Sequence, residues 1–408
     1  MNLNETEACV VEIDIEKDYT VERAGTNSTK WDGLKSRFGR DGLLPLWVAD
    51  MDFKAPECVR EAIARLNGHG VYGYHMVPDG YYRAFIDWEK RRHGYEVKKE
   101  WIRFTAGVVS GLYWFINAMT QKDDACLILT PCYYPFMDAV RDTGRKLVCC
   151  DLVNTDGYYT IDFEKFEEAI RANAVKMFLL CSPHNPVGRV WTKEELRNLL
   201  EICKKYGVFV LSDEIHQDIT FGGHKNIPAA AVGDYDNMLA ILTSASKTFN
   251  LAGMKNSFAV IPDEAVRSRF DRFVKANRIA RGSVFGYAAA EAAYRGGEPW
   301  LEKVLEVIAG NDAYLRDELA SKLPGVTVTP LEGTYLVWID LGAYVRPAEL
   351  REIVQEQCGL AVDYGEWFFE NRTDTHIRIN LATSGKNIET AVQRLVEALG
   401  GGKEHKIK

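Results

Sequence analysis

The segment MFLLCSPHNPVGRVWTKEELRNLLEICKKYGVFVLSD, residues 177–213, places an amphipathic stretch between two short apolar runs. The two runs are MFLLC at 177–181 and VFVLS at 208–212. Thr192 and Glu195 have the spacing of a capping box, and Gly207 stands where a helix commonly ends. The segment therefore predicts a crossover helix over 192–206 between two parallel strands, which is a βαβ unit.

Further apolar runs alternate with amphipathic segments from about residue 100 to 262. They are ACLIL at 125–129, NMLAIL at 237–242 and SFAVI at 257–261. Runs of this length, with helical segments between them, are typical of a mostly parallel sheet that is covered by helices on both faces. The sequence therefore predicts an α/β fold in this part of the chain.

The C-terminal part, from about residue 295, has a different pattern. Long helical segments are expected near 300–323 and 387–399, and strand-like segments stand between them. The strand-like segments are VTVTP at 326–330, TYLVWI at 334–339 and HIRIN at 376–380. This pattern predicts a smaller α+β domain.

Length and charge limit the kinds of partner. With 408 residues the chain exceeds the usual size of one hydrophobic core, so we expect two domains that share a cleft. A net charge of -8 argues against binding to nucleic acid or to an anionic membrane, and favours a small-molecule partner. No run approaches the roughly 20 apolar residues of a membrane helix, and the start of the chain is acidic, so we expect a cytoplasmic protein.

Several common functional motifs are absent from the sequence. The nine cysteines include the adjacent pair Cys149 and Cys150 but no CxxC spacing, so we expect reduced thiols and no metal site. There is no GxGxxG after a strand, no GxxxxGK[ST] and no HExxH. These absences argue against dinucleotide-binding, nucleoside-triphosphatase and zinc-protease functions.

Polar residues follow the apolar runs, where ligands bind in open parallel sheets. Tyr133 follows the run at 125–129, and Asn185 follows the run at 177–181. Asp213 and His216 follow the run at 208–212, and Ser244, Ser246 and Lys247 follow the run at 237–242. Taken singly, each has an ordinary explanation as a turn, a cap or a solvated side chain. Together they offer an amine, an acid, an aromatic face and hydrogen-bond donors, which are the groups that a pyridine aldehyde cofactor needs.

Three motifs resemble those of fold-type-I enzymes of the class I/II aminotransferase superfamily, which use pyridoxal 5′-phosphate (PLP). They are SASKTFNLAG at 244–253, SPHNPVGRVW at 182–191 and SDEIH at 212–216. Four more resemble most closely the cystathionine β-lyase (carbon–sulfur lyase) branch of the MalY/PatB type: LWVADMDF at 46–53, YGYH at 72–75, GVVSGL at 107–112 and PCYYPF at 131–136. The likeness runs through most of the chain.

The resemblance implies a fold-type-I PLP transferase architecture. A large domain with a mostly parallel seven-stranded sheet between helices would be joined to a smaller α+β domain. We expect an N-terminal arm and part of the small domain over 1–54, a large PLP-binding domain over 55–290 and the C-terminal small domain over 291–408.

The resemblance also implies catalytic and ring-binding roles. Lys247 would form the Schiff base with PLP and then act as general base and acid at the substrate Cα. Asp213 would pair with the pyridinium nitrogen, and Tyr133 would stack on the ring. Asn185 and His216 would reach the phenolate oxygen; typical aminotransferases carry a tyrosine three residues after the aspartate, whereas this chain carries His216 as the carbon–sulfur lyases do.

For the cofactor phosphate, the resemblance points to the start of a helix and to the Schiff-base loop. Backbone amides near Val108 and Val109 would face the phosphate at a helix N-terminus, and the hydroxyls of Ser244 and Ser246 would add donors. Many members of the superfamily have an arginine eight residues after the Schiff-base lysine. This chain has Lys255, which cannot bind a phosphate in bidentate fashion.

Substrate binding and dimer formation follow from the same likeness. Arg378 stands where the superfamily carries the guanidinium that holds the substrate α-carboxylate, and Asn185 would assist it. Tyr74 resembles the tyrosine that reaches the phosphate from the neighbouring subunit, so we expect a homodimer. The entrance of the site is expected to be lined by Trp47, Asp50 and Asp52.

The implied reaction is α,β-elimination of L-cystathionine or a related S-substituted cysteine to a thiol, pyruvate and ammonia. The sequence does not choose between cystathionine, cystine and other conjugates. An aminotransferase would use the same Lys247, Asp213 and Arg378, and a regulatory protein that binds a partner on the same fold is a further alternative. The lyase-like motifs and His216 favour elimination.

Overall fold

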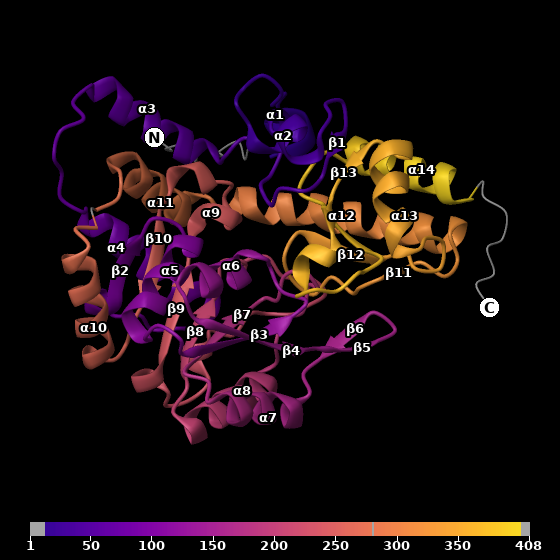
Figure 1. Cartoon of the computed structure of the whole chain (residues 1–408). Coiled ribbons are helices and arrows are strands. Elements are labelled where there is room, and N and C mark those ends of the chain that lie inside the picture. Colours follow the sequence, from indigo (N-terminus) through magenta and orange to yellow (C-terminus); the bar gives the residue numbers. More distant parts are fainter. Residues whose placement is uncertain (1–12, 280, 401–408) are drawn as a thin grey trace, which may run out of the picture.

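The computed structural model describes residues 13–279 and 281–400, and most of the acidic start of the chain lies outside these ranges. Its main sheet has seven strands in the order β2-β10-β9-β8-β7-β3-β4 (Figure 1). In chain order these strands are β2 (Ile102–Thr105), β3 (Ala125–Thr130), β4 (Lys146–Asp151), β7 (Met177–Cys181), β8 (Phe209–Asp213), β9 (Leu239–Thr243) and β10 (Ser257–Val260). β10 runs antiparallel to both of its neighbours, whereas the pairs on the other side of β9 are parallel. The predicted mostly parallel seven-stranded sheet is confirmed.

The βαβ unit at 177–213 forms as predicted. The helix α8 (Lys193–Tyr206) is capped by Thr192, whose hydroxyl accepts from the Glu195 amide at 3.1 Å, while the Glu195 carboxylate accepts from the Thr192 amide at 2.8 Å. Gly207 ends the helix in the left-handed conformation, with φ +65°. The capping box and this glycine thus mark both ends of the helix in the structure as they do in the sequence.

Alternate residues of each central strand face two separate hydrophobic clusters. On β3, Cys126 and Ile128 pack with residues of α5 (Val108–Met119), α6 (Pro135–Asp142) and α10 (Glu264–Ala276). Leu127 and Leu129 belong to the other cluster, with residues of α4 (Asp79–Trp88), α7 (Phe163–Asn173), α8 and α11 (Val284–Gly296). Because helices cover both faces, the strand sequences are apolar throughout instead of alternating.

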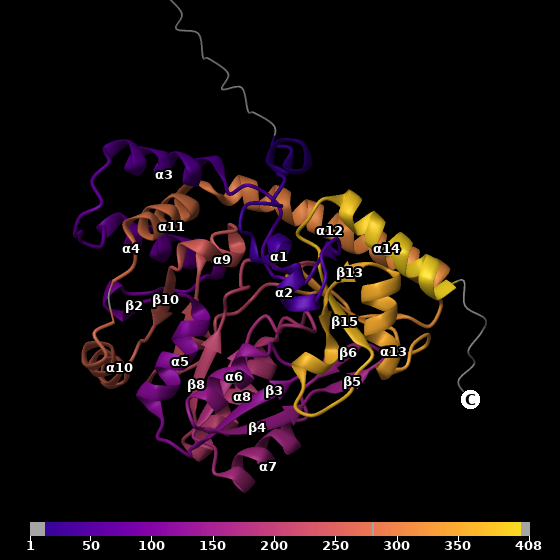
Figure 2. The ribbon, with the colours of Figure 1, turned by 45° about the horizontal axis from the view of Figure 1, so that its top comes forward.

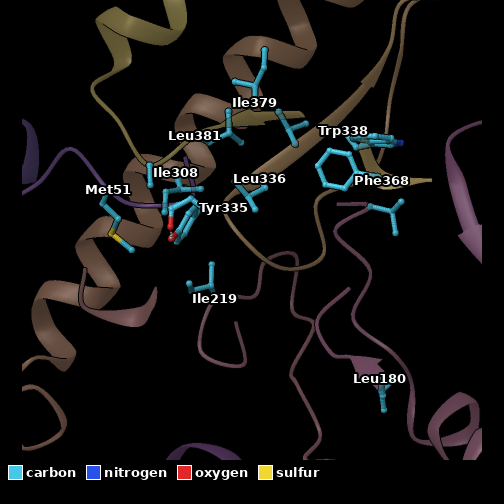
Figure 3. Packing of buried hydrophobic residues seen from close by; sticks show 14 of the residues in the cluster. Met51, Leu180, Ile219, Ile308, Tyr335, Leu336, Trp338, Phe368, Ile379 and Leu381 are labelled. Atoms are coloured by element: carbon cyan, nitrogen blue, oxygen red, sulfur yellow. Dashed lines mark hydrogen bonds between the residues drawn. The ribbon is translucent and has the colours of Figure 1, made fainter. Parts of the chain in front are cut away.

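A smaller sheet with strand order β11-β12-β15-β14 lies at the other end of the molecule (Figure 1). Its strands are β11 (Thr327–Val328), β12 (Leu336–Asp340), β14 (Asp363–Tyr364) and β15 (His376–Asn380). The long helix α12 (Glu298–Lys322) reaches this part, and α14 (Gly385–Gly400) lies along it (Figure 2). Figure 3 shows part of the shared core, in which Leu336, Trp338 and Ile379 belong to the same cluster as Ile308 of α12.

The N-terminal segment joins this smaller part by a short parallel pair. β1 (Leu44–Pro45) pairs with β13 (Leu360–Ala361). The remaining elements are α1 (Thr29–Asp32), α2 (Leu34–Phe38), α3 (Glu57–His69), the hairpin of β5 (Val153–Thr155) and β6 (Tyr158–Thr160), α9 (Ala245–Thr248) and α13 (Pro347–Arg351). No helix within residues 13–279 and 281–400 is both long and apolar enough to cross a membrane.

Candidate active site

A cavity of about 880 Å³, measured out to its open mouth, lies beyond the carboxyl ends of the strands of the main sheet. Eight residues predicted to form the site line it together: Val108, Val109, Tyr133, Asn185, Asp213, His216, Ser246 and Lys247. They come from the start of α5, the loops after β3 and β7, the end of β8 and the helix α9 after β9. The topology thus brings together residues that are far apart in the sequence.

Asp213 is the last residue of β8 and is buried. One of its oxygens accepts from the Ile215 amide at 3.1 Å. Burial raises the pKa of this carboxyl to about 7, against the smaller effects of that amide and of the Lys247 charge. A buried carboxylate with so little compensation suits a cationic partner such as a protonated ring nitrogen.

Lys247 lies on α9 and points back to the N-terminal segment. Its amine donates to the carbonyl oxygen of Ala49, which also accepts from the Tyr335 hydroxyl at 2.8 Å. Burial lowers the pKa of the Lys247 amine to about 8. A lysine with a lowered pKa and a place in a cavity is suited to act as a nucleophile or a base.

His216 is buried against the same tyrosine. Its ring stands edge-on to Tyr335, with 5.6 Å between the ring centroids. Burial, together with the positive charges of Lys247 and Arg378, holds the pKa of His216 well below its usual range, so the imidazole is neutral. Its Nδ1 has no hydrogen-bond partner in the described part of the chain.

The start of α5 forms one end of the cavity. Gly107 precedes the helix with φ +106°, a backbone conformation that favours glycine. Val108 and Val109 follow in the first turn, where amide groups have no acceptor within the helix. These amides and the positive end of the helix dipole are suited to an anionic group such as a phosphate.

The loop after β9 adds further polar groups at the cavity. Ser246 and Lys255 both line it. Ser244 does not: its hydroxyl donates to the Asn256 carbonyl at 2.7 Å and accepts from the Ser246 amide at 3.0 Å. Ser244 therefore holds the loop in shape instead of offering a donor to the cavity.

Arg378 lies behind the cavity lining, on β15 of the smaller sheet. Its Nη1 donates to Asn185 Oδ1 at 2.9 Å, and its Nη2 donates to the Trp47 carbonyl at 3.1 Å and to the Asp363 carboxylate. The side chain is 2% exposed, and its Nε has no partner among the residues that the structure describes. Asn185 thus connects the guanidinium to the cavity.

Two further groups of predicted residues do not line the cavity: Tyr74, and Trp47, Asp50 and Asp52 of the segment 46–53. Tyr74 is fully exposed in the connection between α3 and α4, which loops away from the body of the molecule (Figure 1). Of the segment 46–53, Ala49 lines the cavity. Asp50 and Asp52 pair with Arg23 at 2.7 and 2.9 Å, which ties them to the N-terminal segment.

Of the residues at or beside the site that sequence reasoning missed, four matter most for its polar contacts. They are Ala49, Asn256, Tyr335 and Asp363. Asn256 lines the cavity; its Oδ1 accepts from the Tyr81 hydroxyl at 2.9 Å, and its buried Nδ2 has no partner within residues 13–279 and 281–400. For Asp363 a signal existed, because a charged residue stands there inside the apolar run LAVDY.

The arrangement fits PLP. A buried acid and a buried amine face one cavity, as an aldehyde on a pyridine ring requires. Nδ1 of His216 and Nδ2 of Asn256 are buried polar atoms without a partner in the described chain, and the amides that begin α5 suit the phosphate. Lys247 would hold the aldehyde carbon and Asp213 the ring nitrogen.

Comparisons with known proteins agree with this geometry. The family model for aminotransferase class I and II matches residues 42–395. The chain is 36% identical to cystathionine β-lyase PatB of Bacillus subtilis (strain 168), over 94% of this chain and 99% of that protein. It also resembles two crystal structures, which supports the predicted fold-type-I architecture.

The first is the PLP-bound C–S lyase from Staphylococcus hominis, with a TM-score of 0.89 and 33% identity over 96% of this chain and 99% of that one. The second is cystalysin from Treponema denticola, which contains PLP, with a TM-score of 0.90 and 34% identity over 94% and 98% of the two chains. From the family match over most of its length and from these relatives, it follows that the chain belongs to the aminotransferase class I and II family.

Proposed function

We propose that the chain is a PLP-dependent carbon–sulfur β-lyase, which converts L-cystathionine or a related S-substituted cysteine and water into a thiol, pyruvate and ammonia. The observation that carries the proposal is the single cavity that joins the Lys247 amine to the buried Asp213 carboxylate. The similarity to proteins named cystathionine β-lyase and C–S lyase supports elimination as the reaction.

Four residues of this chain have separate roles in the proposed reaction. PLP, when bound, supplies the electron sink for the electron pair that remains when the Cα proton is removed. Lys247, whose pKa is lowered to about 8, accepts that proton and can return it to the leaving sulfur. Asp213 keeps the ring nitrogen protonated, and Arg378 and Asn185 hold the substrate carboxylate.

A direct assay tests the proposal. The purified protein with PLP is incubated with L-cystathionine in the absence of a 2-oxo acid, and thiol and pyruvate are measured together. We expect equal amounts of both products, and none from Lys247→Ala. If neither forms, but a donor amino acid transfers its amino group when a 2-oxo acid is added, the chain is an aminotransferase and the lyase proposal is wrong.

We further propose that the working unit is a homodimer in which Tyr74 enters the partner's site. The connection between α3 and α4 exposes Val71, Tyr72, Tyr74 and Met76, which is a costly apolar surface for a monomer. Sedimentation of the purified protein tests the dimer. The role of Tyr74 is tested by mixing two inactive variants, Lys247→Ala and Tyr74→Ala, under conditions that exchange subunits.

One site of each mixed dimer then has both an intact Lys247 and an intact Tyr74 from the other subunit. Random exchange would restore about a quarter of the wild-type sites, because half of the dimers are mixed and each has one complete site. No recovery of activity, with mixed dimers verified by mass spectrometry, would exclude the shared site.

A further inference from the structure

We propose that Asp363 is a built-in counter-ion of Arg378 that limits how tightly the site binds a substrate carboxylate. This inference rests on the proposed role of Arg378 and adds a specificity-determining residue to it. Asp363 and Arg378 are directly opposite each other on the neighbouring strands β14 and β15. Their side chains form a buried ion pair, with exposed fractions of 0% for Asp363 and 2% for Arg378.

The hydrogen-bond geometry places Asp363 in competition with a substrate. A guanidinium group has five N–H groups, and both of its bidentate edges include Nη2. The two hydrogens of Arg378 Nη2 are taken by the Trp47 carbonyl and by the Asp363 carboxylate. A substrate carboxylate that accepts from two N–H groups must therefore share Nη2 with the Asp363 carboxylate or displace that carboxylate.

Charge strengthens this competition. The buried pair is neutral as it stands, so a bound substrate carboxylate becomes the second anion beside one guanidinium. Arg37 of α2 is the other cation that acts on Asp363, and its guanidinium is engaged over the Trp367 ring at 4.0 Å. Two carboxylates close to one buried cation repel each other strongly, because the protein interior screens charge weakly.

Protonation of Asp363 relieves this repulsion. Burial raises the pKa of Asp363 to about 6, against the opposing effects of Arg378 and Arg37. The remaining ionisable groups that face it are the phenols of Tyr133 and Tyr134, whose pKa values are raised by burial and which stay neutral near pH 6. Asp363 is therefore ionised at pH 8 and largely protonated at pH 5.

The direct test uses the PLP-loaded protein and 3-(methylthio)propanoate, a carboxylate without an amino group that forms no imine with PLP. Calorimetry measures its affinity for wild type, Asp363→Asn and Asp374→Asn. Asp374 is the matched control, because it is a buried aspartate paired with His376 at the start of β15. We expect at least about tenfold tighter binding in Asp363→Asn, because one of two like charges close to each other is removed, and wild-type affinity in Asp374→Asn.

The pH profile separates a charge effect from a structural one. Wild-type affinity should rise as the pH falls from 8 to 5.5, while the probe itself stays ionised. Lys247 and His216 also lie near Arg378, Asp213 lies near Lys247, and all three contribute to the wild-type profile. The contribution of Asp363 is the part of the pH dependence that disappears in Asp363→Asn. For L-cystathionine we expect this variant to have a lower KM at a similar kcat.

Two results would overturn the inference: unchanged or weaker binding by Asp363→Asn, or a pH profile that this variant leaves as it was. If Asp363→Asn does not fold, Asp363→Ala replaces it in both measurements, because it also removes the carboxylate. The variant Arg378→Ala tests the underlying assumption that Arg378 binds the carboxylate. If the probe binds equally well without Arg378, the carboxylate site itself is wrongly placed, whereas the lyase assay on cystathionine tests the reaction independently.

Discussion

At the scale of single residues, the sequence reveals side chains that act directly and hides those that act through the backbone or through another residue. Lys247, Asp213 and Asn185 stand in recognisable motifs after apolar runs, and the structure places all three at one cavity. Ala49 contributes its carbonyl to Lys247, and every residue type has a carbonyl. Tyr335 directly precedes the buried strand β12, where a tyrosine is typical of an ordinary core residue.

Asp213→Asn is expected to lower kcat at least about a hundredfold, because an amide cannot hold the proton on the ring nitrogen. Glu214→Gln is the matched control, since Glu214 is the next residue and is buried but bonds to Ser212 and the Ala229 amide outside the cavity. Pyruvate release measures both variants. Equal losses in the two would show that burial of an acid in this motif, and not its contact with the ring, is what matters.

Glu214 also predicts a pH dependence of stability. Burial raises its pKa to about 8 in the folded protein, whereas the unfolded chain has the ordinary value of about 4.3. The folded state therefore binds the proton more tightly, and this residue makes wild type lose stability as the pH rises from about 5 to 8. The variant Glu214→Gln does not have this pH-dependent loss of stability.

The free energy of unfolding of Glu214→Gln, relative to wild type, should thus increase with pH by at most about 1.4 kcal/mol per unit across this window. Urea unfolding of the cofactor-free proteins at pH 5.5, 6.5 and 7.5 measures it. A difference that stays constant over the three pH values would contradict the prediction.

At the scale of elements, the interior strands were predictable and the edge strands were not. β7 and β8 are buried on both faces and appear in the sequence as unbroken apolar runs. β2, IRFT, and β4, KLVCCD, lie at the two edges of the sheet, where partial exposure admits polar residues and hides the pattern. The sequence of an individual apolar run also does not indicate which strands are its neighbours in the sheet.

The capping box of α8 predicts a measurable loss of stability. Thr192→Ala removes the hydroxyl that accepts from the Glu195 amide, at a cost of about 1 kcal/mol. Ser321→Ala changes an exposed residue within α12 and should be close to neutral. Urea unfolding compares the two, and equal losses would show that the cap does not stabilise the helix.

At the scale of the whole molecule, the site depends on both sheets and on the N-terminal segment. The main sheet supplies Lys247 and Asp213, the smaller sheet supplies Arg378, and the segment that contains Trp47 and Ala49 lies between them. The domain ranges 1–54, 55–290 and 291–408 stay a prediction. The family resemblance placed Arg378 at the same site as Lys247, but it did not indicate the bonds of Lys247 to Ala49 and of Arg378 to the Trp47 carbonyl, which join residues 198 and 331 positions apart.

An ion pair between the two parts is expected to matter for stability. Arg189, in the loop after β7, donates to Glu332, before β12, at 2.8 Å, and both side chains are buried. Glu332→Gln leaves the buried guanidinium of Arg189 with the Glu195 carboxylate, at 3.1 Å, as its remaining counter-ion and should cost about 2 kcal/mol. Glu318→Gln, which breaks a more exposed helix pair with Lys322, should cost less than about 1 kcal/mol. Losses of similar size in urea unfolding would show that burial of the pair is unimportant.

The pairing of β1 with β13 has a consequence for synthesis on the ribosome. Residues 44 and 45 are synthesised more than 300 positions before their partners, residues 360 and 361. At ordinary elongation rates the early strand waits on the order of tens of seconds. Nascent chains stalled before residue 360 should therefore bury Lys247 and Asp213 in a folded sheet while their N-terminal segment stays open to proteases. The site around Arg378 is completed only after β13, β14 and β15 have been synthesised.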